Sequence, residues 1–543
     1  MKRLCVFLAV CLMCTVLSPA AGADTAFGLA SIFGDGMVLQ QGRPVQVFGF
    51  GRDGETVALT LKKGNAVVES RTAAVSGGRW SAELPAQAGS FDEYRLEAAC
   101  GNAVKAVDHL VFGEVWVAGG QSNMEWTLGK AAEAAEWEKT THDGRVRFFV
   151  TLDSGHADPQ ADSAGYWLVS GSWDAAKRCS AIGYMFAYRL SETLGVPVGV
   201  VNTAQGATRL CTWLGRETAE AHPDFKTLVT TRIHPGADDG TWDSLGRFYN
   251  SRIAPLRGYQ AAGILWYQGE ADIERGNPEV LRQGIPLLVE DWSAVFGDGA
   301  ARIPFLSVQL ASFSYRSDYL EGSGYTGGAD GTIVPMGNFL MNQGVEQAAA
   351  FGKALSVPIY DVPVKLSEIH PPDKGPVAVK LLDAALGMVY GKKELYSGPK
   401  PVSATFDGST VEVVFDNVGD GLKLAAGETL QGFRLGGTAV QAAIRGTHTV
   451  SIPAADGSVS DVSLAFATRN QDANLVNSGG YYPLAFQMPV ERVEKHPGAA
   501  ALIRPADKPG PKRVGPLPYI LCALGIAAEG LALVFLLRKK GRA

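Results

Sequence analysis

The 543-residue sequence predicts an α/β protein in which an all-β region precedes and follows a central parallel sheet. Between about residues 111 and 395, short apolar segments alternate with segments of helical periodicity, which is typical of a mainly parallel sheet covered by helices on both faces. On either side of that stretch, single apolar and polar residues alternate between Gly-, Asp- and Asn-rich turns, the pattern of small β-sandwiches. The expected order is therefore β, α/β, β.

The two ends of the chain carry apolar segments of their own. Met1-Lys2-Arg3 precedes an apolar run over residues 4–17, and Ala21-Gly22-Ala23 follows, which is the pattern of a secretory signal peptide cut after Ala23. Residues 517–537 are apolar apart from Glu529 and precede a basic tail, which predicts a transmembrane helix with the tail on the cytoplasmic side. The alternative for this segment is a buried C-terminal helix.

These patterns divide the chain into consecutive segments. The expected segments are a signal peptide (1–23), an N-terminal β domain (24–110), an α/β domain (111–395), a C-terminal β domain (396–492), a Pro- and Lys-rich linker (493–516), a transmembrane helix (517–537) and a basic tail (538–543). The formal net charge is −6 and the body of the chain has no basic block, which excludes nucleic acid as a partner. We therefore expect an exported, membrane-anchored protein whose body lies on the periplasmic or extracellular side.

Individual elements can be placed within this outline. In the β regions, alternation predicts strands at residues 57–61, 94–100, 411–415 and 462–466. In the central region, apolar runs predict strands at residues 111–118, 198–203, 263–267, 305–310 and 355–360. Ser180 is a suitable N-cap for a helix over 181–194, and Pro376 is a good first-turn residue for a helix over 377–389. The central strands and helices therefore alternate along the chain.

Polar residues follow three of the predicted parallel strands, and ligands of open α/β sheets bind beyond the carboxyl ends of the strands. Gly119-Gly120 leads from the first strand to Ser122, and the segments after the next two strands contain Gly206 and Gln268. Acyl transfer requires a nucleophile and donors that stabilise the oxyanion. The Ser122 hydroxyl could be the nucleophile, and N–H groups of these segments could be the donors. The alternative is that Ser122 only caps a helix. Met124 occupies the position of the second glycine of G-x-S-x-G, which argues against an α/β-hydrolase elbow.

A serine nucleophile also requires a base. His370 lies in a loop before a predicted helix, with acidic residues nearby, and His234 is the rival. A histidine in such a loop is often only solvated. The residues alone therefore leave open whether His370 is a catalytic base or a solvated surface residue. Ligand-spaced His/Cys clusters and nucleotide-binding fingerprints are absent from the sequence, and we expect no metal and no cofactor.

Three ordered motifs resemble the sialate O-acetylesterase family of the SGNH hydrolase superfamily. They are Gly120-Gln121-Ser122-Asn123-Met124, Trp266-Tyr267-Gln268-Gly269-Glu270 and Ile369-His370-Pro371-Pro372-Asp373-Lys374. The resemblance covers roughly residues 30 to 490 and implies an SGNH-type three-layer hydrolase domain with flanking β-sandwich-like domains. It also implies that Ser122 is the nucleophile and His370 the base, and that the N–H groups of Ser122 and Gly206 and the Gln268 side chain form the oxyanion hole.

The chain departs from the family pattern at the acid. Glu368 stands where the family usually has an aspartate two residues before the histidine, and Asp361 is a rival; a serine–histidine pair without a strong acid is a third reading. Glu270 is expected to be a structural carboxylate rather than a catalytic one. The resemblance implies a carbohydrate O-acetylesterase, with an O-acetylated sialate or xylan as substrate. The alternative from another class is a non-catalytic glycan-binding protein.

Overall fold

The computed structural model describes residues 26–233, 241–274, 278–297, 299, 302–313, 333–455, 459–466 and 472–493. The predicted signal peptide, transmembrane helix and basic tail lie outside these residues, as do His234 and all but the first residue of the linker. None of the helices in the described ranges is both long enough and apolar enough to cross a membrane. The strands and helices up to Arg492 belong to one compact unit.

The central sheet has the strand order β10-β9-β11-β8-β12-β13-β14. Its strands are β8 (Ala103–Gly120), β9 (Val146–Thr151), β10 (Gly165–Val169), β11 (Val198–Asn202), β12 (Gly263–Tyr267), β13 (Phe305–Val308) and β14 (Ala354–Val357). All neighbours in this order are parallel except β10, which runs antiparallel to β9 at the edge. The prediction of an α/β protein is confirmed, although β9 and β10 were not among the predicted strands.

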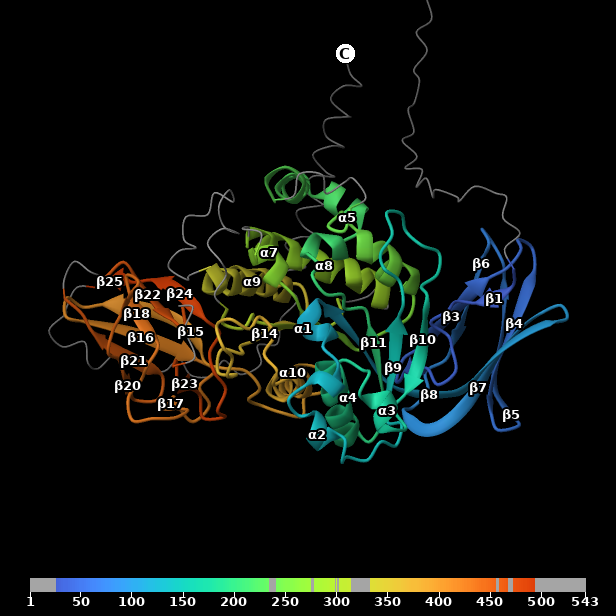
Figure 1. Cartoon of the computed structure of the whole chain (residues 1–543), viewed down its shortest axis with the longest axis horizontal. Helices are drawn as coiled ribbons and strands as arrows, with labels where there is room; N and C mark the ends of the chain where they lie inside the picture. Colours follow the sequence, from blue (N-terminus) through green and yellow to red (C-terminus); the bar gives the residue numbers. More distant parts are fainter. Residues whose placement is uncertain are drawn as a thin grey trace, which may run out of the picture. The chain divides into compact units, whose positions relative to one another are not determined.

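Four long helices accompany this sheet, namely α4 (Ala181–Leu194), α8 (Glu279–Phe296), α9 (Ile333–Ala349) and α10 (Gly375–Met388). In Figure 1, α8 and α9 lie on one side of the strands and α4 and α10 on the other. Helix α4 has the predicted bounds: the Ser180 hydroxyl accepts a hydrogen bond from the Gly183 N–H, and Gly195 ends the helix in the left-handed region with φ 72°. Shorter helices are α1 (Ser122–Glu125), α2 (Ala134–Trp137), α3 (Trp173–Ala176), α5 (Arg216–Ala221), α6 (Pro223–Thr227) and α7 (Glu270–Glu274).

The first part of the chain is rich in strands, as predicted. Its strands are β1 (Gly28–Leu29), β2 (Val38–Gln40), β3 (Val45–Phe50), β4 (Thr56–Lys63), β5 (Ala66–Ala74), β6 (Arg79–Leu84) and β7 (Ser90–Cys100). Strand β8 pairs with β7 over its first part and with β2, β11 and β12 over its second part. The predicted border between residues 110 and 111 therefore falls inside one continuous strand, whose residues change from exposed to fully buried along its length.

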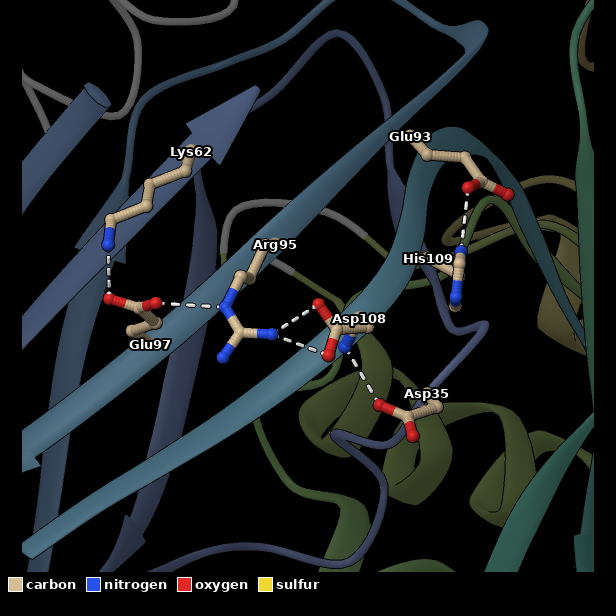
Figure 2. A network of polar contacts seen from close by, with 7 residues as sticks. All are labelled: Asp35, Lys62, Glu93, Arg95, Glu97, Asp108 and His109. Atoms are coloured by element: carbon tan, nitrogen blue, oxygen red, sulfur yellow. Dashed lines mark hydrogen bonds and ion pairs between the residues drawn. The ribbon is translucent and has the colours of Figure 1, made fainter. Parts of the chain in front are cut away.

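A ladder of charged side chains joins β4, β7 and β8 near this border (Figure 2). The Arg95 guanidinium donates to Glu97 at 2.8 Å and to Asp108 at 2.5 Å, and the Asp108 N–H donates to Asp35 at 2.8 Å. The remaining members of the ladder are Lys62, which donates to Glu97, and His109, which contacts Glu93. Because these side chains are exposed to solvent, which screens their charges, each pair contributes little to stability. The ladder therefore supports the strand register and lies apart from the residues considered below.

The last part of the chain forms two further sheets. One has the order β20-β21-β16-β15-β25 and the other β19-β18-β22-β24, while β17 and β23 form a separate pair. The strands are β15 (Lys400–Phe406), β16 (Thr410–Asp416), β17 (Lys423–Leu424), β18 (Phe433–Leu435), β19 (Thr438–Ala439), β20 (Ala443–Arg445), β21 (Thr449–Pro453), β22 (Asp461–Leu464), β23 (Leu475–Val476), β24 (Phe486–Pro489) and β25 (Glu491–Arg492). Alternate residues of both sheets, such as Val413 and Val462, share one buried apolar cluster.

Candidate active site

The carboxyl ends of three neighbouring strands bring the predicted polar segments to one edge of the central sheet. Ala118 of β8 is paired with Asn202 of β11, and Gly120 of β8 is paired with Tyr267 of β12. Gly120 has φ 123°, and a Cβ atom there would lie 2.1 Å from the Tyr267 carbonyl oxygen. Only glycine fits this turn, which takes the chain from the buried strand to Ser122, the first residue of α1.

Ser122 and His370 meet at this edge although 248 residues separate them, with the serine Oγ 2.7 Å from the histidine Nε2. The His370 ring is half-buried, and its centroid lies 5.4 Å from that of the Trp126 ring at an interplanar angle of 31°. Burial lowers the pKa of His370 below its usual value, and the Lys374 cation lowers it further. A neutral imidazole hydrogen-bonded to a hydroxyl is the arrangement that activates a serine for nucleophilic attack.

The two candidate acids lie elsewhere. The Glu368 carboxylate is 3.5 Å from the Lys365 ammonium, and its side chain is 44% exposed. Asp361 accepts two hydrogen bonds of 2.8 Å from Lys380. Within the described ranges, the only hydrogen bond of His370 is the one to Ser122. The structure therefore differs from the expected Glu368–His370 contact, because the Glu368 N–H closes a turn on the Lys365 carbonyl and the carboxylate pairs with the lysine of that turn.

The predicted oxyanion donors have partners of their own. The Gly206 N–H donates to the Glu125 carboxylate at 2.7 Å, and a Cβ atom on Gly206 would lie 3.5 Å from the Ser122 Cβ atom. The Glu125 side chain is exposed, so this acceptor is free to turn toward solvent. The Ser122 N–H is the first of a helix and therefore has no intrahelical acceptor.

The Gln268 side chain is fully buried, and its amide nitrogen bonds to groups inside the protein. Its amide nitrogen donates to the Thr208 carbonyl at 3.1 Å and to the Asp272 carboxylate at 2.5 Å. Both N–H groups of the amide therefore already donate to acceptors within the protein. In this structure Gln268 supports the turn that follows Gly206 rather than presenting a donor beside Ser122.

Two residues of the motifs, Asn123 and Lys374, prove to be buried partners of the site. The Asn123 amide nitrogen donates to the Glu270 carboxylate at 2.6 Å, and its amide oxygen accepts from the Lys374 ammonium at 2.6 Å. Burial raises the pKa of Glu270 and lowers that of Lys374. Asn123 and Lys374 lie in the same motifs as Ser122 and His370, yet the sequence analysis did not identify these contacts. A motif does not specify which distant residues its side chains bond to.

Arg252 is a second buried cation that sequence reasoning missed. It donates to the carbonyl groups of Thr203 and Ala204 at 3.0 and 2.8 Å and to the Gln205 side chain at 2.7 Å. These bonds hold the segment that leads to Gly206. The sequence carries no signal for this role, because an isolated arginine usually indicates a surface position. Within the described parts of the chain, no group of three or more His, Cys, Asp or Glu side chains is arranged to hold a metal ion.

A serine hydroxyl bonded to an imidazole at the carboxyl edge of a parallel sheet is typical of hydrolytic enzymes that use a serine nucleophile. Residues 112–325 match the family model described as carbohydrate esterase, sialic acid-specific acetylesterase. The chain is 28% identical over 451 residues to the sialate O-acetylesterase of Mus musculus, covering 73% of this chain and 79% of that protein. It is 27% identical over 415 residues to the Homo sapiens protein of the same name, covering 70% and 74%.

The crystal structure of a carbohydrate acetylesterase from Xanthomonas citri also resembles this protein, with a TM-score of 0.72 and 27% identity over 85% of this chain and 99% of that one. The comparisons confirm the resemblance to the sialate O-acetylesterase family. The chain is thus similar to the sialate O-acetylesterases, and it is an enzyme, a carboxylic-ester hydrolase.

Proposed function

We propose that this enzyme is a carbohydrate O-acetylesterase that removes acetyl groups from O-acetylated sialic acids with Ser122 as nucleophile. The observation that carries the proposal is the 2.7 Å contact between Ser122 Oγ and His370 Nε2 in a relative of the sialate O-acetylesterases. The name of the Xanthomonas citri structure specifies no sialate, so an esterase for another acetylated glycan such as xylan is the second candidate.

The reaction follows from the positions of these two side chains. Ser122 Oγ attacks the acetyl carbonyl carbon while its proton passes to His370 Nε2. The tetrahedral intermediate collapses as His370 returns that proton to the sugar oxygen, which leaves as a hydroxyl group. Water, deprotonated by the same imidazole, then attacks the acetyl-enzyme. The bond to Ser122 Oγ breaks, the imidazole returns the proton to Oγ, and acetate is released. No step uses a metal ion.

The N–H groups of Ser122 and Gly206 are the oxyanion donors in this proposal. The carboxylate oxygen of Glu125, 2.7 Å from the Gly206 nitrogen, supports it, because this N–H already donates a hydrogen bond to an anionic oxygen. Glu125 turns away when the acetyl group enters, since two negative oxygens at one donor repel each other. Gln268 acts indirectly, by holding the Thr208 turn.

The fold supports this assignment. Helices α8 and α9 on one side of the central sheet and α4 and α10 on the other are the arrangement expected of an SGNH-type three-layer hydrolase domain over residues 111–395 (Figure 1). The strands before and after it support flanking β-sandwich-like domains over residues 24–110 and 396–492.

Glu368→Gln is expected to lower kcat by less than about threefold, because the carboxylate of Glu368 faces Lys365 and exposed pairs are weak. Asp361→Asn is the matched change at the second candidate acid and should also leave kcat within about threefold. Hydrolysis of p-nitrophenyl acetate measures both. A loss approaching the roughly 10⁴-fold effect of an Asp-to-Asn change in a serine protease triad would instead give that residue the orienting role.

Acetate release from defined substrates tests the proposed specificity. The purified protein is incubated with O-acetylated sialic acids and, in parallel, with acetylated xylan, and kcat/KM is compared. Faster release from the sialic acids is expected, and the reverse ranking would favour the second candidate. A protein that releases neither acetate nor p-nitrophenol would contradict the esterase proposal and favour a glycan-binding role.

We also propose that the enzyme is exported and anchored by residues 517–537, on the sequence pattern alone. The full chain is expected to sediment with membranes and to require detergent for release, whereas a chain that ends at residue 510 should remain in the soluble fraction of the exported protein. Quantitative immunoblots of the fractions measure the difference. If the full chain without its signal peptide is soluble, residues 517–537 do not form a membrane anchor.

A further inference from the structure

Asn123 connects the turn that carries Ser122 to the loop that carries His370. Its side chain is 1% exposed, and its amide nitrogen donates to the Ile369 carbonyl at 3.1 Å as well as to Glu270 at 2.6 Å. Asn123 follows Ser122 in the chain and Ile369 precedes His370. One amide therefore fixes the backbone directly beside both residues of the pair.

Lys374 fixes the same loop on the other side of His370. Its ammonium is buried, donates to the Asn123 amide oxygen at 2.6 Å and lies 5.4 Å from the centroid of the Trp126 ring. The Trp126 ring in turn lies over the His370 imidazole. The loop is thus held before His370 by the bond to the Ile369 carbonyl and after it by the bond from the Lys374 ammonium. The Trp126 ring contacts the imidazole itself.

Two buried groups of opposite sign flank Asn123. Glu270 and Lys374 contact opposite ends of the same amide, and the Glu133 carboxylate also acts on the Lys374 ammonium. A buried charge without a partner is costly, and the two groups compensate each other through Asn123. The paired charges also determine the orientation of the amide, because the ammonium needs the oxygen and the carboxylate needs the nitrogen.

In a serine–histidine–aspartate triad, the carboxylate holds the imidazole in its working orientation. Neither Glu368 nor Asp361 contacts His370 here. We propose that Asn123, oriented by Glu270 and Lys374, is a positioning residue that keeps His370 at Ser122 and so takes over the orienting task of the triad carboxylate. The inference rests on the proposed roles of Ser122 and His370. It assigns to Asn123, Glu270 and Lys374 no contact with the substrate.

Asn123→Ala tests this inference through a split between kcat and KM. Misplacing a catalytic group by about 1 Å costs about 10²-fold, so we expect kcat for p-nitrophenyl acetate to fall about 100-fold while KM changes less than about threefold. Phosphorylation of Ser122 by diisopropyl fluorophosphate, in which the serine oxygen displaces fluoride and the imidazole takes the proton, should slow by a similar factor. That reaction depends on the pair but not on the identity of the natural substrate.

Two variants at Glu270 provide a second test if Asn123→Ala fails to fold. Glu270→Gln keeps an acceptor for the Asn123 amide and should retain kcat within about threefold, whereas Glu270→Ala removes it and should lower kcat about tenfold or more. Asn477→Ala is the matched control, because Asn477 is also buried and forms several hydrogen bonds, but to Ser397 and Asn417 in the last part of the chain. It should lower the melting temperature and leave kcat unchanged.

Two results would overturn the inference. One is an Asn123→Ala enzyme with wild-type kcat and a wild-type rate of phosphorylation by diisopropyl fluorophosphate. The other is equal kinetic losses in Asn123→Ala and Asn477→Ala at equal loss of melting temperature, which would show a general stability effect. Failure of the proposed function gives a different result: the wild-type protein releases no acetate from any substrate, while the rates of phosphorylation by diisopropyl fluorophosphate still report whether Asn123 positions the pair.

Discussion

Ser122→Ala is expected to lower kcat/KM for p-nitrophenyl acetate by about three orders of magnitude or more while the protein remains folded. Removal of a nucleophile abolishes the covalent step, and only the catalysis supplied by binding and the oxyanion donors is left. The fold is expected to persist because Ser122 is only partly buried and its hydroxyl has one described partner, His370. Steady-state kinetics and the melting temperature measure the two quantities.

The control for this variant is Ser70→Ala, which removes an exposed hydroxyl on β5 and should leave kcat/KM unchanged. Mass spectrometry after diisopropyl fluorophosphate treatment gives a second check, since the wild-type protein should carry one diisopropylphosphoryl group and Ser122→Ala none. Near-wild-type activity of Ser122→Ala would show that another residue is the nucleophile.

His370→Ala is expected to have the second large effect, a loss of about three orders of magnitude or more in kcat. The serine and histidine of such a pair act as a unit, so removal of the base costs nearly as much as removal of the nucleophile. His222→Ala, a change at an exposed histidine of the same chain, is the control and should leave kcat unchanged. A His370→Ala enzyme that retains a tenth or more of the activity would exclude His370 as the base.

The pH profile of the wild-type enzyme follows from the same side chain. The base must be neutral, so activity falls as pH decreases through the pKa of His370. Burial, and then the Lys374 cation, lower that pKa below the usual value of about 6.5, so the midpoint of the acid limb of kcat/KM should lie below about pH 6.5. A midpoint clearly above 6.5 would contradict a half-buried imidazole beside a cation.

Much of the central fold could be predicted because its signals are local. Unbroken apolar runs indicate strands that are buried on both faces, and the predicted strand at 263–267 and helix at 181–194 agree with the structure residue for residue. The order of β8, β11 and β12 at the middle of the sheet then places Ser122, Gly206 and Gln268 along one edge. Strands β9 and β10 were not predicted, although their sequences, Val-Arg-Phe-Phe-Val-Thr and Gly-Tyr-Trp-Leu-Val, are largely apolar.

The sequence predicted the class of the protein, and the resemblance of its motifs to a known family implied the pair Ser122 and His370, because a strand, a glycine turn and a motif are properties of short segments. Only the tertiary structure decided which polar groups meet. Glu368 contacts Lys365 rather than His370, and the Gln268 amide donates to the Asp272 carboxylate. Asn123 contacts Lys374, which is 251 residues away in the chain. Such partners depend on how distant segments pack, and a buried polar group takes whichever donor or acceptor that packing brings within about 3 Å.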